Sequence, residues 1–174
     1  MRTRQSLNGW WDYRIGEGRW TKIRVPCSVR PVGRSEYALD FKAAPHRRAF
    51  LVLEGITYAA EVTLNGKKLG DMLPYCEYRF EVTDILTEEN HLSVLIEDIA
   101  PVFGPSEGWE NYGGIIRGVY VEYTGESFIE DVVWSTTFEE NYTAAHCRVE
   151  VTADASPVTV RLLDSRGRCV GSAA

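Results

Sequence analysis

The chain has little positive charge, which excludes two classes of partner. Its 174 residues include 19 lysines and arginines against 25 aspartates and glutamates, so the formal net charge at pH 7 is -6. Nucleic-acid backbones and anionic lipid surfaces are bound largely through clustered basic side chains. The sequence also contains no apolar stretch long enough to span a bilayer. We therefore expect neither a nucleic-acid partner nor a membrane partner.

A leader-like apolar segment is missing from the first residues. The sequence starts Met1-Arg2-Thr3-Arg4-Gln5-Ser6, with neither an apolar core region nor a small-residue cleavage site. This start favours a cytoplasmic protein.

Cysteine is scarce and widely spaced. Cys27, Cys76, Cys147 and Cys169 form no Cys-x-x-Cys pair, so the usual spacing of a zinc site or a redox motif is missing. The glycines form no phosphate-binding loop. We expect no metal ion and no cofactor. We expect reduced cysteines that lie mostly in the core, because a free cysteine behaves as a small hydrophobic residue.

Alternation of apolar and polar residues is the dominant pattern. In residues 36–42, Tyr37, Leu39 and Phe41 fall on one face and charged residues on the other. Such alternation predicts a half-buried β-strand. The same pattern predicts strands at 76–82 and 92–97, while helical periodicity is nearly absent.

A hairpin is predicted where Asn65-Gly66 separates two strand-like runs, because both central residues of a type I′ turn need positive φ. Further runs at 20–25, 49–53 and 117–123 bring the total to about eight strands before Thr124. A jelly-roll sandwich uses this number of strands. The sequence therefore predicts an all-β fold.

The strand pattern starts again after Thr124. Residues 128–134 predict one strand, 147–152 a second and 158–162 a third, followed by a turn at 164–167. An immunoglobulin-type sandwich needs roughly 100 residues and about seven strands, so this segment is only the start of one. We predict one domain at 1–126 and a partial domain at 127–174. The valines of the partial domain leave an apolar face exposed, for which we expect dimers or partial disorder.

The best candidates for substrate binding lie in a long segment rich in glycine and proline, residues 101–114. Trp109 and Tyr112 offer aromatic faces that stack on a sugar ring, and Glu110 and Asn111 offer groups that bond its hydroxyls. The alternative is that Trp109 and Tyr112 only pack this loop onto its own sandwich. Arg117, which follows the loop, is either a ligand contact or a structural donor to loop carbonyls.

Other residues are expected to be structural. Trp10, Trp11 and Trp20 are interpreted as anchors that pin the chain start to the sheet, the alternative being a stacking platform. The histidines are isolated from any nucleophile motif, and the carboxylates are scattered over solvent faces. We therefore assign no catalytic residue.

The order of several segments resembles the N-terminal sugar-binding domain of glycoside hydrolase family 2, the group of β-galactosidases, β-glucuronidases and β-mannosidases. The resemblance covers about residues 7–135 and is carried by Leu7-Asn8-Gly9-x-Trp11-x-Tyr13, Val25-Pro26, the strand of Tyr37 and Phe41, Leu53-Glu54-Gly55-Ile56 with the Asn65-Gly66 hairpin, 80–86 with 89–94, and 111–119. The chain departs from the family pattern at 71–75 and at Glu81, where aspartate is usual.

The resemblance implies a jelly-roll, galactose-binding-like β-sandwich followed by the start of an immunoglobulin-like β-sandwich, with a catalytic (β/α)₈ barrel in the rest of the parent protein. It implies a carbohydrate partner, a β-glycoside, and a loop that in some relatives reaches the active site of the barrel. Retaining hydrolysis needs two carboxyl groups on that barrel. The chain is thus expected to be a non-catalytic accessory domain. The alternatives are an independent carbohydrate-binding module and a purely structural assembly domain.

Overall fold

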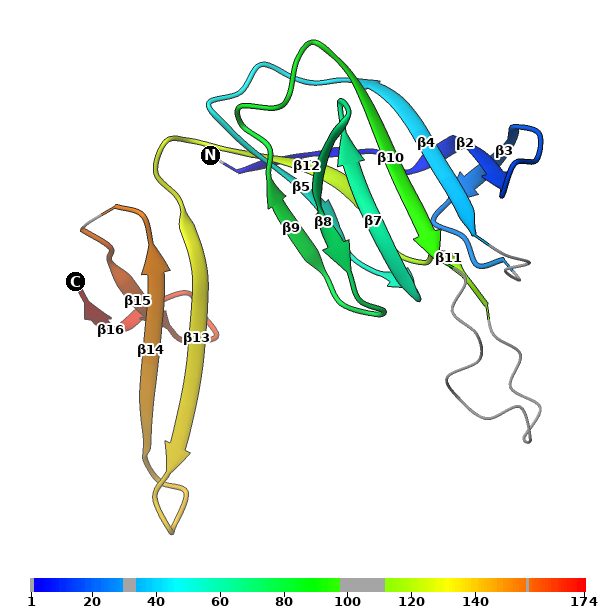
Figure 1. The fold of residues 1–174 in the computed structure, drawn as a ribbon. Coiled ribbons are helices and arrows are strands. Elements are labelled where there is room, and N and C mark those ends of the chain that lie inside the picture. Colours follow the sequence, from blue (N-terminus) through cyan, green and yellow to red (C-terminus); the bar gives the residue numbers. More distant parts are fainter. Residues whose placement is uncertain (1, 30–33, 98–111, 156) are drawn as a thin grey trace, which may run out of the picture. The chain divides into compact units, whose positions relative to one another are not determined.

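The computed structural model describes residues 2–29, 34–97, 112–155 and 157–174. The chain divides into two units, one ending at Thr124 and the other comprising Gly125–Ala174. Antiparallel β-sheets form the regular structure of both units (Figure 1), which confirms the predicted all-β class. Within the described ranges, no helix is long and apolar enough to cross a bilayer.

The first unit contains a six-stranded sheet with the strand order β3-β2-β4-β10-β7-β8. Its strands are β2 (Gly9–Ile15), β3 (Thr21–Val25), β4 (Ser35–Lys42), β7 (Ala59–Leu64), β8 (Lys67–Met72) and β10 (Glu89–Glu97). The alternation predicted for residues 36–42 is realised in β4, where Tyr37 and Phe41 are buried. Strand β2 was not predicted, although its residues alternate in the same way.

A four-stranded sheet, with the order β1-β12-β5-β9, forms the second layer. Its strands are β1 (Thr3–Ser6), β5 (Arg48–Leu53), β9 (Tyr78–Glu81) and β12 (Val119–Thr124). Two further short strands, β6 (Ile56–Thr57) and β11 (Gly114–Ile115), pair with each other. The strands β1, β6 and β11 were not predicted, because β6 and β11 have only two residues each and β1 contains no apolar residue that could alternate with polar ones.

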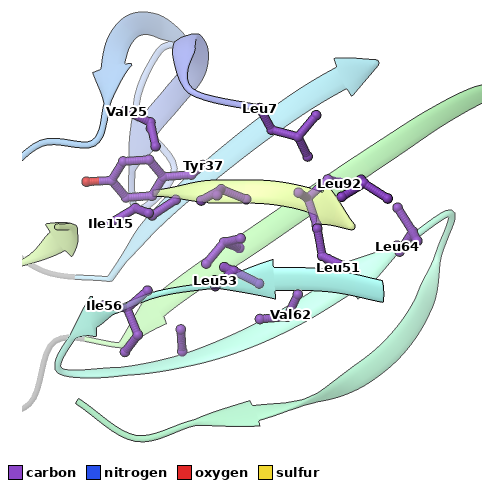
Figure 2. Close-up of a cluster of buried hydrophobic side chains, with 14 of the residues drawn as sticks. Leu7, Val25, Tyr37, Leu51, Leu53, Ile56, Val62, Leu64, Leu92 and Ile115 are labelled. Carbon is purple, nitrogen blue, oxygen red and sulfur yellow. The ribbon is translucent and has the colours of Figure 1, made fainter. Parts of the chain in front are cut away.

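The hydrophobic core is built from alternate residues of both sheets (Figure 2). On the six-stranded sheet, Leu92 lies opposite Leu64, and Val94 lies opposite Val62. On the other sheet, Leu51 lies opposite Val121. Directly opposed residues share a face of an antiparallel sheet, so these side chains all face the same interior.

The predicted hairpin is present between β7 and β8. Asn65 and Gly66 have φ values of 52° and 77°, as a type I′ turn requires. The side-chain amide of Asn65 also donates to the Ile85 carbonyl and to Asn90 Oδ1, both at 2.9 Å. Its Oδ1 accepts from the His91 amide at 2.8 Å. Asn65 therefore fixes both the turn and its neighbours.

The second unit consists of two hairpins in the part of the chain that the structure describes. The strands β13 (Ile129–Phe138) and β14 (Ala145–Ala153) form one, and β15 (Val160–Leu163) and β16 (Cys169–Ala173) form the other. The predicted turn at 164–167 connects β15 to β16, while β16 itself was not predicted. The immunoglobulin-like character of this unit stays a prediction.

The expectation that three tryptophans anchor the chain start to the sheet is confirmed for Trp11, which is fully buried. It is wrong for Trp10 and Trp20, which keep 67% and 46% of their surface exposed. Trp10 neighbours Trp11 in β2, and consecutive strand residues point to opposite faces of a sheet.

The cysteines are also less buried than expected. All four are free, as predicted, but Cys76, Cys147 and Cys169 are exposed and only Cys27 is partly buried. Cys76 precedes β9 instead of lying within it. Cys147 lies on an exposed hairpin.

Candidate functional site

Three tyrosines come together just before β11 (Gly114–Ile115), where the described chain resumes at residue 112. Tyr58 directly follows β6, and Tyr112 lies two residues before β11. Because β6 and β11 pair with Thr57 opposite Gly114, both tyrosines lie at the same end of this short ladder. The Thr57 hydroxyl donates to the Tyr112 carbonyl at 3.0 Å. We call Tyr58, Tyr75 and Tyr112 the tyrosine cluster.

Tyr75 joins the cluster from the connection between β8 and β9. Its amide donates to the Ile56 carbonyl at 3.0 Å, and its ring meets the Tyr58 ring edge-on at a centroid distance of 6.2 Å. Its φ is 64°, a left-handed conformation that is uncommon for a bulky residue. Such conformations persist where the surroundings enforce them and are frequent at functional sites.

The tyrosine hydroxyls interact with one another. A hydrogen bond with the Tyr112 hydroxyl is the main reason why the pKa of Tyr75 is raised, followed by burial and a hydrogen bond with Tyr58. A tyrosine is protonated at neutral pH even at its ordinary pKa, and 44% of the Tyr75 surface is exposed. The cluster thus combines aromatic rings with neutral hydroxyl groups.

The end of the loop is held by a close backbone contact. Gly114 has φ of 134°, and a Cβ at this position would lie 2.7 Å from the Cys27 carbonyl oxygen. The Cys27 amide donates to the Ile115 carbonyl at 2.8 Å. Glycine is needed here for both the conformation and the approach. This contact fixes the position from which Tyr112 extends.

The structure describes two of the five predicted site residues. Tyr112 is half-buried within the tyrosine cluster. Arg117 is exposed, and its side chain lies over Gly55, where a Cβ would come within 3.2 Å of the Arg117 Cδ. The other three predicted residues, Trp109, Glu110 and Asn111, lie outside the described residues, and their role stays a prediction.

Sequence reasoning missed Tyr58 and Tyr75. Tyr75 belongs to the segment 71–75, where the chain departs from the family pattern. The available signal was that these aromatic residues lie in connections between strands, where no alternating pattern explains them. Their meeting with Tyr112 depends on the pairing of β6 with β11, which the sequence pattern did not reveal.

The chemistry available at the cluster is binding chemistry. Phenol groups donate and accept hydrogen bonds, and their rings pack against apolar ligand faces. In the described part of the chain, no group of three or more histidine, cysteine or carboxylate side chains could hold a metal ion. Several carboxylates are paired with cations, as in Glu81 with Arg48 at 2.9 Å and Glu36 with Arg14 at 2.6 Å.

Comparison with known proteins places this unit in a family. Residues 17–102 match the family model of the glycosyl hydrolase 2 galactose-binding domain-like group. A β-glucuronidase of Bacteroides fragilis is 29% identical over 139 residues, which are 75% of this chain and 18% of that protein.

Solved structures share the fold. A β-glucuronidase of an uncultured Clostridium species superposes with a TM-score of 0.85 at 22% identity, over 99% of this chain and 38% of that chain. The Bifidobacterium dentium β-glucuronidase, complexed with coumarin-3-O-glucuronide, superposes with a TM-score of 0.83 at 20% identity, over 99% of this chain and 39% of that chain. The chain thus spans less than two fifths of the length of these relatives. The chain contains the galactose-binding-like N-terminal domain of glycoside hydrolase family 2, which matches the N-terminal region of β-glucuronidases.

Proposed function

We propose that this chain is a non-catalytic accessory domain of a family 2 glycosidase that hydrolyses the O-glycosidic bond of β-glycosides. The hydrolytic step belongs to a catalytic barrel in another part of that protein. The loop end, with the tyrosine cluster and residues 109–112, contributes to the binding of the sugar beside that barrel. The observation that carries this proposal is the convergence of Tyr58, Tyr75 and Tyr112 at the end of the loop.

The chemistry of the cluster supports a binding role. Retaining glycosidases need two carboxyl groups roughly 5 Å apart, one as acid/base and one as nucleophile. The cluster instead presents phenols, which are protonated at neutral pH, and hydrogen bonding and burial raise the pKa of Tyr75 further. Neutral hydroxyls that both donate and accept hydrogen bonds suit sugar hydroxyls, while ring faces suit sugar C–H groups.

The relatives support the choice of reaction. The Bacteroides fragilis relative is a β-glucuronidase, of which this chain matches 18%. A segment of that size leaves ample length for a separate catalytic domain. We therefore propose that the parent protein hydrolyses a β-glycoside. This chain would contact the substrate.

Two experiments test this proposal. The 174-residue chain alone is expected to leave 4-nitrophenyl β-glycosides intact, and measurable turnover would refute the non-catalytic assignment. In the longer enzyme, Trp109→Ala and Asn111→Ala are expected to raise KM or lower kcat. Asn141→Ala, in an exposed turn of the second unit, is the matched control. Unchanged kinetics in both loop variants would leave the loop with a packing role only.

A further inference from the structure

A concave site lies on the outer face of the six-stranded sheet, away from the hydrophobic core. It is a hollow of about 310 Å³, near the lower end of the range for small-molecule pockets. We call it the sheet cleft. Its floor is formed by side chains from the four strands β2, β4, β7 and β10: Arg14, Glu36, Glu61, Thr63, Ser93 and Leu95.

The strand register brings these residues together. Arg14 lies opposite Glu36 across β2 and β4, and Ser93 lies opposite Thr63 across β10 and β7. Leu95 of β10 lies opposite Glu36 of β4. Directly opposed residues point to the same face of an antiparallel sheet. The cleft is therefore built on rigid strands, which position side chains more accurately than loops do.

The charged side chains of the cleft floor are already paired, and the exposed Glu17 also lines the cleft. Arg14 Nη2 lies 2.6 Å from Glu36 Oε2, and Lys68 Nζ lies 2.8 Å from Glu61 Oε2. Arg34, at the rim, pairs with Glu97 at 3.1 Å. An ionic ligand would have to compete with these pairs. The pairing therefore favours an uncharged ligand.

The same groups retain hydrogen-bonding capacity for such a ligand. A carboxylate accepts about four hydrogen bonds and a guanidinium donates five, so one ion pair does not exhaust either group. Ser93 Oγ donates to Glu36 Oε1 at 3.3 Å, and Thr63 adds a second hydroxyl. The cleft thus offers closely spaced donors and acceptors. A polyhydroxylated molecule, whose every hydroxyl both donates and accepts, matches this mixture.

An aromatic ring lies next to the cleft. The Arg14 guanidinium carbon is 4.6 Å from the centroid of the Trp20 ring, and 46% of the Trp20 surface is exposed. Arg14 is therefore held by both a carboxylate and an aromatic face. The exposed part of the indole provides an apolar surface for the C–H groups of a sugar.

We propose that the sheet cleft is a binding site for a neutral carbohydrate, separate from the tyrosine cluster and independent of the function proposed for it. Paired charges explain the preference for an uncharged sugar, and the hydroxyls, carboxylates and Trp20 provide its contacts. If the cleft is only a solvated surface with ion pairs, it binds no glycoside.

The test is saturation-transfer difference NMR on the 174-residue chain with three probes at millimolar concentration. Methyl β-D-glucopyranoside and methyl β-D-galactopyranoside are neutral, and methyl β-D-glucuronide carries a negative charge. At least one neutral glycoside is expected to give signals, and the glucuronide is expected to give weaker ones. Silence from both neutral probes, or a stronger response to the glucuronide, would overturn the proposal.

Matched variants locate the site. Ser93→Tyr fills the cleft, while His91→Tyr places the same side chain two residues away on the same face of β10, outside the cleft. The first is expected to weaken binding at least about tenfold and the second to leave it unchanged. Thr63→Val replaces the hydroxyl with a methyl group and is expected to weaken binding severalfold. It serves as the cleft variant if Ser93→Tyr does not fold. Signals that persist in the cleft variants would place binding elsewhere, for example at Tyr112, and contradict the proposal.

Discussion

Arg79 of β9 extends across the ring of Phe50 to reach the carboxylate of Glu122 in β12. Its Nη2 donates to Glu122 Oε1 at 2.8 Å, and only 3% of the Glu122 side chain is exposed. The guanidinium carbon lies 3.8 Å from the Phe50 ring centroid. Arg4, from β1, bonds the other carboxylate oxygen at 3.2 Å. Glu122 thus links three strands of the four-stranded sheet.

Replacing Glu122 is expected to destabilise the first unit strongly. Glu122→Ala removes the carboxylate that Arg79 and Arg4 bond, and a buried donor left without its acceptor typically costs about 1–3 kcal/mol of unfolding free energy. Urea denaturation followed by tryptophan fluorescence measures the change. Glu89→Ala is the control, because its ion pair with Lys42 is exposed and such pairs are worth at most about 1 kcal/mol. Equal effects of the two substitutions would contradict a structural role for the Glu122 network.

The cysteines are expected to react at different rates with a thiol reagent. Burial raises the pKa of the Cys27 thiol, which reduces its reactive thiolate fraction at pH 8. Cys76, Cys147 and Cys169 are exposed. Titration of the native chain with a disulfide reagent should therefore modify three thiols quickly and the fourth only slowly or after unfolding. Rapid modification of Cys27 would show that its environment is more open than described.

The hairpin of β13 and β14 has one apolar face and one polar face. Val132 is opposite Val151, and Trp134 is opposite Val149, whereas Val133 is opposite Glu150. Exposed apolar faces of this size favour association. Val132→Asp is expected to reduce self-association of the 174-residue chain in sedimentation experiments.

Val133→Asp is the matched control for this substitution. Val132 and Val133 are 52% and 51% exposed, are adjacent in sequence and differ in the face they occupy. Val133→Asp should leave self-association nearly unchanged. If both substitutions have the same effect, net charge and not the apolar face controls association.

Local sequence patterns predicted most of the strands of the first unit. The alternation of Tyr37, Leu39 and Phe41 identified β4 and its core-facing side. Asn65-Gly66 identified the hairpin of β7 and β8, because a type I′ turn limits the residues that fit it. Both signals depend on residues within a few positions along the sequence, so they can be recognised without knowledge of the tertiary structure.

Burial was harder to predict, because it depends on what covers a face. Alternation assigns Cys147 to the same side as Val149 and Val151, yet Cys147 is exposed on its hairpin. Trp10 and Trp11 show the opposite case: their adjacency in β2 already required that one of them point outward. Glu122 is buried on the outer face of its sheet because arginine side chains from other strands cover it.

The candidate sites depend on pairings between distant segments. Tyr58, Tyr75 and Tyr112 meet through the pairing of β6 with β11, and the sheet cleft is assembled from four strands. Each strand or connection contributes only one or two of the side chains that form these sites. Such sites follow from sheet order and register, which no local pattern of this sequence specifies.

The most direct test of sugar contact at the loop end is the effect of Tyr112→Ala on kcat/KM of the longer glycosidase. Removal of the ring and the hydroxyl is expected to lower kcat/KM about tenfold or more, which corresponds to about 1.4 kcal/mol. Tyr142→Ala, which removes an exposed tyrosine of the second unit, should leave kcat/KM unchanged. A folded Tyr112→Ala enzyme with unaltered kcat/KM would contradict a role of the tyrosine cluster in substrate binding.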